Sequence, residues 1–247
     1  MADREILVIS EGPTEKKLIQ RLFKVFSARP VTVVTFKTNI YRLYDLYEAQ
    51  GQSYEDLDLI SVLRSDSSSH FKTPEREALA DSRRYTDIFL IFDFDPHAQG
   101  YSASKLLKLM THFSDSTDAG RLYINYPMVE SFRHMALPSK WTTQTEAEFL
   151  QRNFAMANLT DYKEVVDKEG FQLSNQLTED DYVHVIQAHA RKASGLIGCS
   201  PELIIQQTQL KKLLFDQCDR ISQAKSGAVV NTSCFVVPEL YPQRVKL

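Results

Sequence analysis

Residues 5–15, EILVISEGPTE, decide the fold of this chain. Residues 5–10 form a short apolar run rich in branched side chains, which is typical of a strand buried on both faces. The run ends at Gly12 and Pro13, and proline suits the first position of a helix. An apolar stripe at helical spacing follows, so we predict a helix over residues 13–28.

The alternation of strand and helix continues to about residue 135. Further strands are predicted over residues 31–36, 87–92 and 121–126. Helices are predicted over residues 40–63 with a break near Gly51, over 73–84, over 102–113 and from Pro127 onward, with a serine-rich loop over 65–73. Continuous apolar strands that alternate with helices favour an α/β fold, a mostly parallel sheet with helices on both faces.

The pattern changes after Pro138. Helices are predicted over residues 144–158, 160–168, 179–193 and 201–224, and strand character returns only at about 228–237. We therefore divide the chain into an α/β domain, residues 1–137, and a mainly helical region, residues 138–247.

The composition is that of a soluble globular protein, with 247 residues, 43% of them hydrophobic and 25% charged. No apolar run approaches the roughly 20 residues that span a bilayer, so no membrane association is expected. The N-terminus does not resemble a signal peptide. Three cysteines without close pairing argue against a disulfide framework or a cysteine zinc site, and favour a cytoplasmic protein.

The net charge of −3 argues against strong unaided binding to nucleic acid, because neutralising phosphates supplies most of that affinity. Metal ions, a local basic face or a partner would have to supply positive charge. The best basic face is on the first predicted helix, where Lys17, Arg21 and Lys24 could guide a phosphate backbone. The plain alternative is a solvated helix face.

Carboxylates gather just beyond the predicted strands, where open parallel sheets bind their ligands. They are Glu11, Glu15, Asp93, Asp95 and Glu130. Such a cluster is costly unless cations occupy it, and Mg²⁺ prefers carboxylate oxygen. Asp93 and Asp95 could face one ion if Phe94 points back into the core.

Each acid also has a plainer explanation. Glu11, Glu15 and Glu130 could complement a helix dipole, and aspartates often end strands. The ordered combination at the ends of separate strands favours a site over these alternatives.

Three segments resemble known motifs of one family. Residues 9–15, ISEGPTE, resemble the E-G-x-T-E signature of Toprim domains, above all nucleases of the OLD (overcoming lysogenization defect) type. Residues 91–95, IFDFD, resemble their D-x-D, and residues 125–132, NYPMVESF, resemble the N-P-x-x-E segment of small Toprim proteins from bacterial defence loci. The resemblance covers residues 4–135.

The resemblance implies roles for the acids. Glu11 would be a metal ligand or general acid/base, and Asp93 and Asp95 would be catalytic ligands of Mg²⁺ or Mn²⁺. Glu15 would be a further metal ligand, as would Glu130. Two ions, roughly 4 Å apart, are the arrangement known for in-line phosphoryl chemistry. The lysine that steadies transition-state charge in OLD-type enzymes has three candidates, Lys105, Lys140 and Lys225.

The function implied is a metal-dependent endonuclease that cleaves DNA or RNA as the effector of an anti-phage defence system. Its implied partners are a nucleic acid substrate, a controlling ABC-type ATPase and a second copy of the chain in a homodimer. The helical region would be a docking surface or a substrate lid. The alternative is a non-catalytic Toprim-like adaptor.

Two other enzyme classes fit less well. Haloacid-dehalogenase-like phosphatases also use D-x-D, but they place threonine or valine where this chain has His97. A P-loop ATPase is excluded because G-x-x-x-x-G-K-[ST] does not occur.

Overall fold

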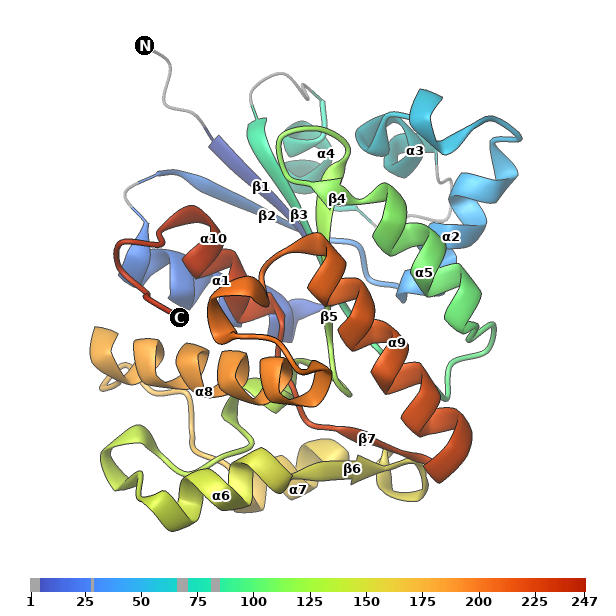
Figure 1. Ribbon diagram of the computed structural model, residues 1–247. Coiled ribbons are helices and arrows are strands. Elements are labelled where there is room, and N and C mark those ends of the chain that lie inside the picture. Colours follow the sequence, from blue (N-terminus) through green and yellow to red (C-terminus); the bar gives the residue numbers. More distant parts are fainter. Residues whose placement is uncertain (1–4, 28, 66–70, 81–84) are drawn as a thin grey trace. The chain divides into compact units, whose positions relative to one another are not determined.

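The computed structural model describes residues 5–27, 29–65, 71–80 and 85–247 (Figure 1). Its α-helices are α1 (Pro13–Phe26), α2 (Ile40–Ala49), α3 (Leu59–Ser65), α4 (Thr73–Ala78), α5 (Ala103–His112), α6 (Thr143–Gln151), α7 (Tyr162–Glu169), α8 (Glu179–Ile197), α9 (Gln207–Ala224) and α10 (Val236–Leu240). Its strands are β1 (Glu5–Ser10), β2 (Val31–Thr35), β3 (Tyr85–Asp93), β4 (Ser114–Asp115), β5 (Gly120–Asn125), β6 (Asn153–Ala155) and β7 (Ser226–Ala228).

The chain forms two compact units. Unit one comprises residues 1–93 and 98–123, and unit two comprises residues 94–97 and 124–247. These units differ from the predicted domains 1–137 and 138–247, because residues 124–137 group with the C-terminal region. Within unit two, the Thr232 hydroxyl donates to the carbonyl of Ile124, and Tyr126 forms a β-bridge with Val230.

The main sheet has five strands in the order β2-β1-β3-β5-β4. β1 pairs in parallel with both β2 and β3, whereas the short β4 pairs antiparallel with β5. The sheet is thus mostly parallel, as predicted, and the fold is α/β. Because β1 and β3 are neighbours, the segments that follow them begin at the same edge.

The central strands form because their side chains are apolar on both faces. Ile6, Leu7, Val8 and Ile9 of β1 are fully buried, and so are residues 89–92 of β3. α1 packs on β1 and β2 through its apolar stripe, and α2 packs on α5. The predicted break near Gly51 is present, because a 3₁₀ turn over residues 54–56 separates α2 from α3.

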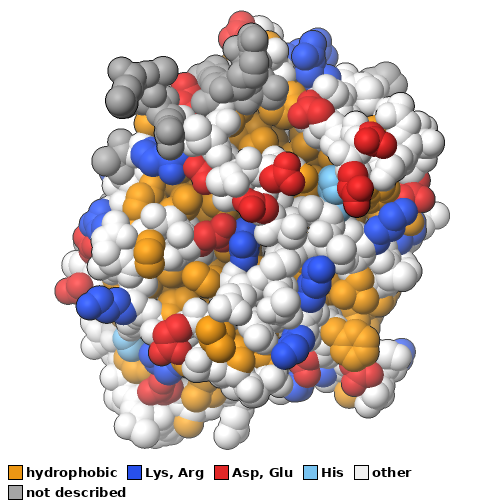
Figure 2. All heavy atoms as spheres, turned by 45° about the horizontal axis from the view of Figure 1, so that its top comes forward, with side chains coloured by type: hydrophobic (Ala, Val, Ile, Leu, Met, Phe, Trp, Pro, Cys, Tyr) orange, Lys and Arg blue, Asp and Glu red, His pale blue; other side chains and the backbone are white. Residues whose placement is uncertain are grey.

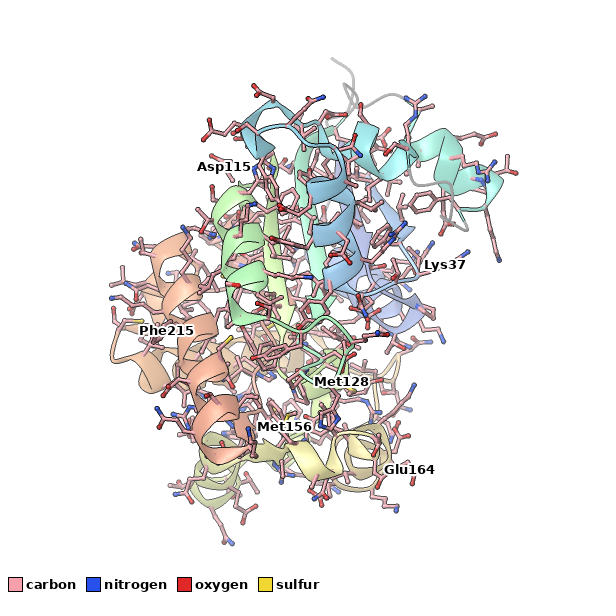
Figure 3. All side chains as sticks on the ribbon, turned by 90° about the vertical axis from the view of Figure 1, so that its right-hand side faces the viewer. Lys37, Asp115, Met128, Met156, Glu164 and Phe215 are labelled. Atoms are coloured by element: carbon pink, nitrogen blue, oxygen red, sulfur yellow. The ribbon has the colours of Figure 1, made fainter. Side chains whose placement is uncertain are left out.

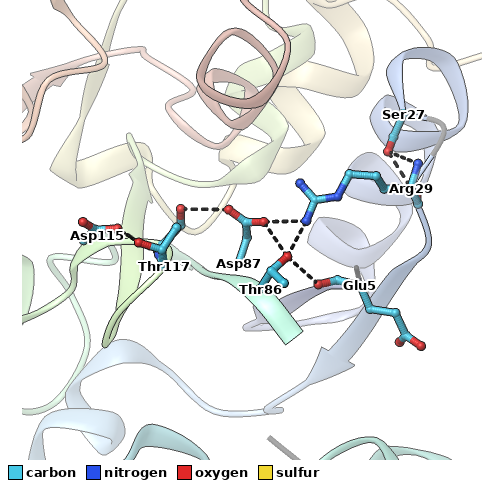
Figure 4. A network of polar contacts seen from close by, with 8 residues as sticks. Glu5, Ser27, Arg29, Thr86, Asp87, Asp115 and Thr117 are labelled. Carbon is cyan, nitrogen blue, oxygen red and sulfur yellow. Dashed lines mark hydrogen bonds and ion pairs between the residues drawn. The ribbon is translucent and has the colours of Figure 1, made fainter. Parts of the chain in front are cut away.

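A polar cluster holds the amino end of β3 (Figure 4). The buried Asp87 accepts a hydrogen bond and ion pair from Arg29, with 2.5 Å between Nη2 and Oδ2. The hydroxyls of Thr86 and Ser116 also donate to this carboxylate. Asp87 is therefore a structural acid at the end of the sheet opposite to Asp93.

Unit two contains a small antiparallel sheet and several buried polar groups. β6 pairs with β7, and Phe154 lies opposite Gly227. His189 is fully buried on α8, where its Nδ1 accepts the N–H of Asn231 at 3.0 Å. Burial lowers the pKa of His189 to about 3, so the ring is a neutral structural element.

Two helices predicted for unit two are present, but their predicted bounds were wrong. The helix predicted over residues 144–158 ends at Gln151, because the Lys192 ammonium donates to the carbonyls of Phe149 and Arg152. β6 and a 3₁₀ turn over residues 156–158 follow in its place. The helix predicted over 201–224 begins as a 3₁₀ turn over residues 201–203, and α9 covers only its later part.

The strand predicted over residues 228–237 was also wrong for most of its length. β7 ends at Ala228, and residues 233–240 are helical. The reason is Asn231, whose side-chain oxygen accepts the N–H of Cys234 and the hydroxyl of Ser233, and so turns the chain. After Pro127 the structure forms only a 3₁₀ helix, over residues 129–133.

Parts of three predictions lie outside the described residues. They are residue 28 of the first helix, residues 66–70 of the serine-rich loop and residues 81–84 of the helix predicted over 73–84.

Candidate functional site

The carboxyl ends of β1 and β3 lie side by side. Ser10 pairs with Ile91 in register, and the N–H of Glu11 donates to the carbonyl of Ile91 at 3.1 Å. Glu11 directly follows β1, and Asp93 is the last residue of β3, two residues beyond Ile91. The parallel register therefore brings the first two sequence motifs to one point.

The side chain of Glu11 joins the two motifs directly. Its Oε2 accepts the backbone N–H of Asp93 at 3.2 Å. The carbonyl of Glu11 also accepts the N–H of Lys37, at 2.8 Å, beyond the end of β2. Both acids are half-buried, so their carboxylates are held near the surface by the ends of the strands.

Glu15 has the structural role that the sequence left open. It is buried, and its Oε2 accepts the N–H of Gly12 with 2.5 Å between the heavy atoms. This contact is half of a capping box at the start of α1. The carboxylate thus satisfies an amide that the first turn of a helix leaves without a partner.

The second aspartate of the D-x-D belongs to unit two. Phe94 is fully buried, and its N–H donates to the carbonyls of Asn125 and Pro127. Asp95 is half-buried and has a φ of 31°. Positive φ is costly for a residue with a side chain, and such positions concentrate at functional sites.

Glu130 also lies in unit two. It is buried in the 3₁₀ helix over residues 129–133 and forms an ion pair with Lys163, with 3.6 Å between Oε1 and Nζ. The neighbouring motif residue Asn125 is buried too, and its side-chain oxygen accepts the N–H of Ser233.

Of the predicted acids, the structure joins Glu11 and Asp93 by a direct contact within unit one. Glu15 caps α1 in the same unit, and Asp95 and Glu130 belong to the other unit. Within the described ranges, no group of three or more His, Cys, Asp and Glu side chains is arranged to hold a metal ion.

The predicted basic face is formed on α1. Lys17 and Lys24 are exposed, and Arg21 between them is half-buried. The exposed lysines are seven residues apart, so they share one face of the helix.

The three lysine candidates have separate surroundings. Lys105 pairs with Asp45 at 3.2 Å and lies over the ring of Tyr44. Lys140 is exposed in a 3₁₀ turn, and Lys225 caps the end of α9.

A fourth lysine, Lys37, was missed in the sequence although the same rule about strand ends would have found it. It follows β2, is exposed, and has a φ of 64° (Figure 3). Its N–H to Glu11 places its backbone at the same edge as the candidate acids.

Comparison with protein families, curated proteins and solved structures found no match to this chain. Across the described ranges, no helix combines the length and the apolar character that crossing a bilayer requires.

Proposed function

We propose that this chain is a Toprim-type nuclease that uses Mg²⁺ or Mn²⁺ to cleave phosphodiester bonds in DNA or RNA. The observation that carries the proposal is the hydrogen bond from the Asp93 N–H to the Glu11 carboxylate. It joins the two most specific motifs at the carboxyl ends of adjacent parallel strands, where α/β sheets bind their ligands. The proposal includes the Toprim arrangement with helices on both faces of the sheet.

The chemistry of this pair suits a hard divalent ion, because both donors are carboxylates. The resemblance gives Asp95, the second aspartate of the D-x-D motif, the role of an ion ligand as well. Glu15 and Glu130 would have to exchange their present partners, the Gly12 amide and the Lys163 ammonium, to do the same. Bound ions would supply positive charge and lower the pKa of a water ligand.

The protein's own groups would then have distinct tasks. Glu11 would accept the proton of the attacking water, since the Asp93 N–H holds its carboxylate in place. The exposed Lys17 and Lys24 would attract the phosphate backbone toward this edge.

The test is cleavage of duplex DNA, single-stranded DNA and tRNA with either ion. Glu11→Gln keeps an oxygen for the Asp93 N–H but loses the charge, so we expect it to fold and to lose at least about a hundredfold in rate. Asp93→Asn should behave alike. The control Glu164→Gln removes an exposed acid of α7 and should keep full activity. Full activity in both site variants would contradict the proposal.

We also propose that a partner, an ABC-type ATPase in a defence system, presents or releases the nuclease. The net charge of −3 supports dependence on a partner, because little counterion release is available to the chain alone. Rapid Glu11-dependent cutting by the isolated chain would refute this requirement and leave the nuclease proposal standing.

A second candidate is a non-catalytic adaptor. It is favoured by the lack of a three-residue metal group in the described ranges and by the existing partners of Glu15 and Glu130. Thermal unfolding with and without Mg²⁺ separates the two. An ion that binds only the folded site raises the melting temperature, and in Glu11→Gln and Asp93→Asn the rise should vanish. An adaptor without a site would show no rise.

A further inference from the structure

A large cavity in unit one lies apart from the candidate acids. Its volume is about 1050 Å³. Its walls are the loop over residues 52–59, one face of α5 and the turn that joins β4 to β5. Ile88, near the amino end of β3, forms part of its floor, whereas Asp93 ends the same strand. The cavity is therefore a separate feature from the edge that carries Glu11.

The walls of the cavity are strongly acidic. The lining carboxylates are those of Glu55, Asp56, Asp58 and Asp118. All four residues are exposed. Figure 2 shows several Asp and Glu side chains in the upper half of one face of the molecule. Asp58 caps α3 through the N–H of Ser61, and no ion pair joins the other three acids to a described residue.

The one lysine among the described lining residues does not offset this charge. Lys108 is already paired with Glu48, with 2.6 Å between Nζ and Oε1, and lies over the ring of Tyr54. Glu48 in turn accepts the hydroxyl of Tyr54 at 2.6 Å. The Lys108 charge is thus balanced within the protein, and the walls keep a net negative charge.

The lining histidine stays neutral. Burial lowers the pKa of His112, although Asp118 and Glu55 act in the opposite direction. Its Nε2 is buried and has no hydrogen-bond partner among the described residues. Burial thus disfavours the charged form of this ring, so it does little to offset the negative charge of the wall.

The floor of the cavity is apolar. Leu57, Ile88, Leu107 and Ala119 line it, and each is only half-buried. Apolar surface left open beside exposed acids favours an occupant with both apolar and basic groups. Such walls repel phosphate, so nucleic acid is excluded as the occupant.

We propose that this cavity binds a short segment of a partner protein in which basic side chains alternate with apolar ones. Charge complementarity selects the basic groups, and the half-buried floor selects the apolar groups. The volume lies at the upper limit of sites for drug-sized molecules, which favours several residues of peptide over a compact cation. This inference is independent of the proposed nuclease function.

The test uses a labelled eight-residue peptide of alternating lysine and leucine, with fluorescence anisotropy at physiological salt. The double variant Glu55→Gln/Asp56→Asn should weaken binding at least about tenfold. The matched control Glu164→Gln/Asp180→Asn removes the same charge from exposed acids of unit two, and should weaken binding less than about twofold. Asp118→Asn, in the turn that joins β4 to β5, should also weaken binding.

Two further peptides and one small cation complete the design. A peptide of alternating glutamate and leucine should not bind, and one of alternating lysine and serine should bind more weakly than the parent. Equal weakening by the cavity and control variants would overturn the proposal, since it would show only general charge attraction. Equal affinity of the serine peptide, or stronger binding of spermidine, would also overturn it in favour of a small polyamine.

Discussion

The two units bury different kinds of side chain. In unit one, the central strands bury an almost unbroken apolar run, residues 6–9, and polar groups such as Asp87 lie at the strand ends. In unit two, the buried set includes Lys192, His189 and Asn231, each held by specific hydrogen bonds. Apolar burial depends on composition and spacing, whereas polar burial depends on partners that only the fold supplies.

Leu7→Ala tests the apolar side of this comparison. Leu7 is fully buried in β1, so its truncation should lower the free energy of unfolding by about 3 kcal/mol. The exposed Leu150 is the control. Because hydrophobic stabilisation is roughly proportional to the apolar area buried, Leu150→Ala should lower the free energy of unfolding by well under 1 kcal/mol. Chemical denaturation measures the free energy of unfolding of both variants. Equal losses would show that burial of Leu7 in β1 contributes no more to stability than the exposed Leu150.

Gly170→Ala tests how closely the backbone packs in unit two. A Cβ at Gly170 would lie 2.3 Å from the carbonyl oxygen of Arg133 and 2.8 Å from that of Val166. Backbone atoms cannot move away without disturbing the elements to which they belong, so we expect the free energy of unfolding to fall by about 2–3 kcal/mol. Gly195 has open space around it in α8, and Gly195→Ala should stabilise the protein by up to about 1 kcal/mol. A stable Gly170→Ala protein would contradict the close approach.

The buried histidines predict acid sensitivity in unit two. Burial is the main cause that lowers the pKa of His189 to about 3 and that of His134 to about 4. The unfolded chain therefore binds more protons between about pH 6.5 and 4, and stability falls as the pH falls through this range.

The variant His189→Asn checks this assignment. The asparagine oxygen can replace Nδ1 as acceptor for the Asn231 N–H but does not titrate in this range. Unfolding free energies measured from pH 7 to 4 should have a shallower slope in the variant. An unchanged slope would assign the acid sensitivity to other groups.

The smallest effect is expected for Glu15→Gln, which tests whether Glu15 and Glu11 have different roles. Glu15→Gln should cost about 0.5–1 kcal/mol, because the cap loses its charge beside the amino end of α1. As a cap only, it should leave any Mg²⁺-dependent rise in melting temperature intact, in contrast to Glu11→Gln. Loss of that rise in Glu15→Gln would make Glu15 a metal ligand.

The candidate site was predictable where it followed from strand order. The rule that ligands bind beyond parallel strands identified Glu11 and Asp93, and the register of β1 and β3 joins them. The partners of Glu15 and Glu130 were not predictable in the same way. The Gly12 amide that Glu15 accepts is local to α1, so the sequence allowed a cap as one of two roles for Glu15. The Lys163 partner of Glu130 lies in another element, α7, and no local pattern indicates it.

The cavity and the C-terminal turns were not predictable either. The acids of the cavity come from the loop over residues 52–59 and from the turn at Asp118. No periodicity in the sequence relates these two segments. The run over residues 228–237 is apolar enough for a strand, yet the side chain of Asn231 bends it into helical turns.

The sequence by itself determined the α/β alternation, the buried central strands and the acids that follow them. These features depend on local apolar periodicity and on breakers such as Gly12 and Pro13, which act within a few residues. Only the tertiary structure decided where α6 ends, which acids meet and which are already paired. Those outcomes depend on side chains such as Lys192, whose ammonium satisfies carbonyls 40 or more residues away in the chain. A local pattern cannot specify such partners, because the contacts exist only after the distant segments have packed.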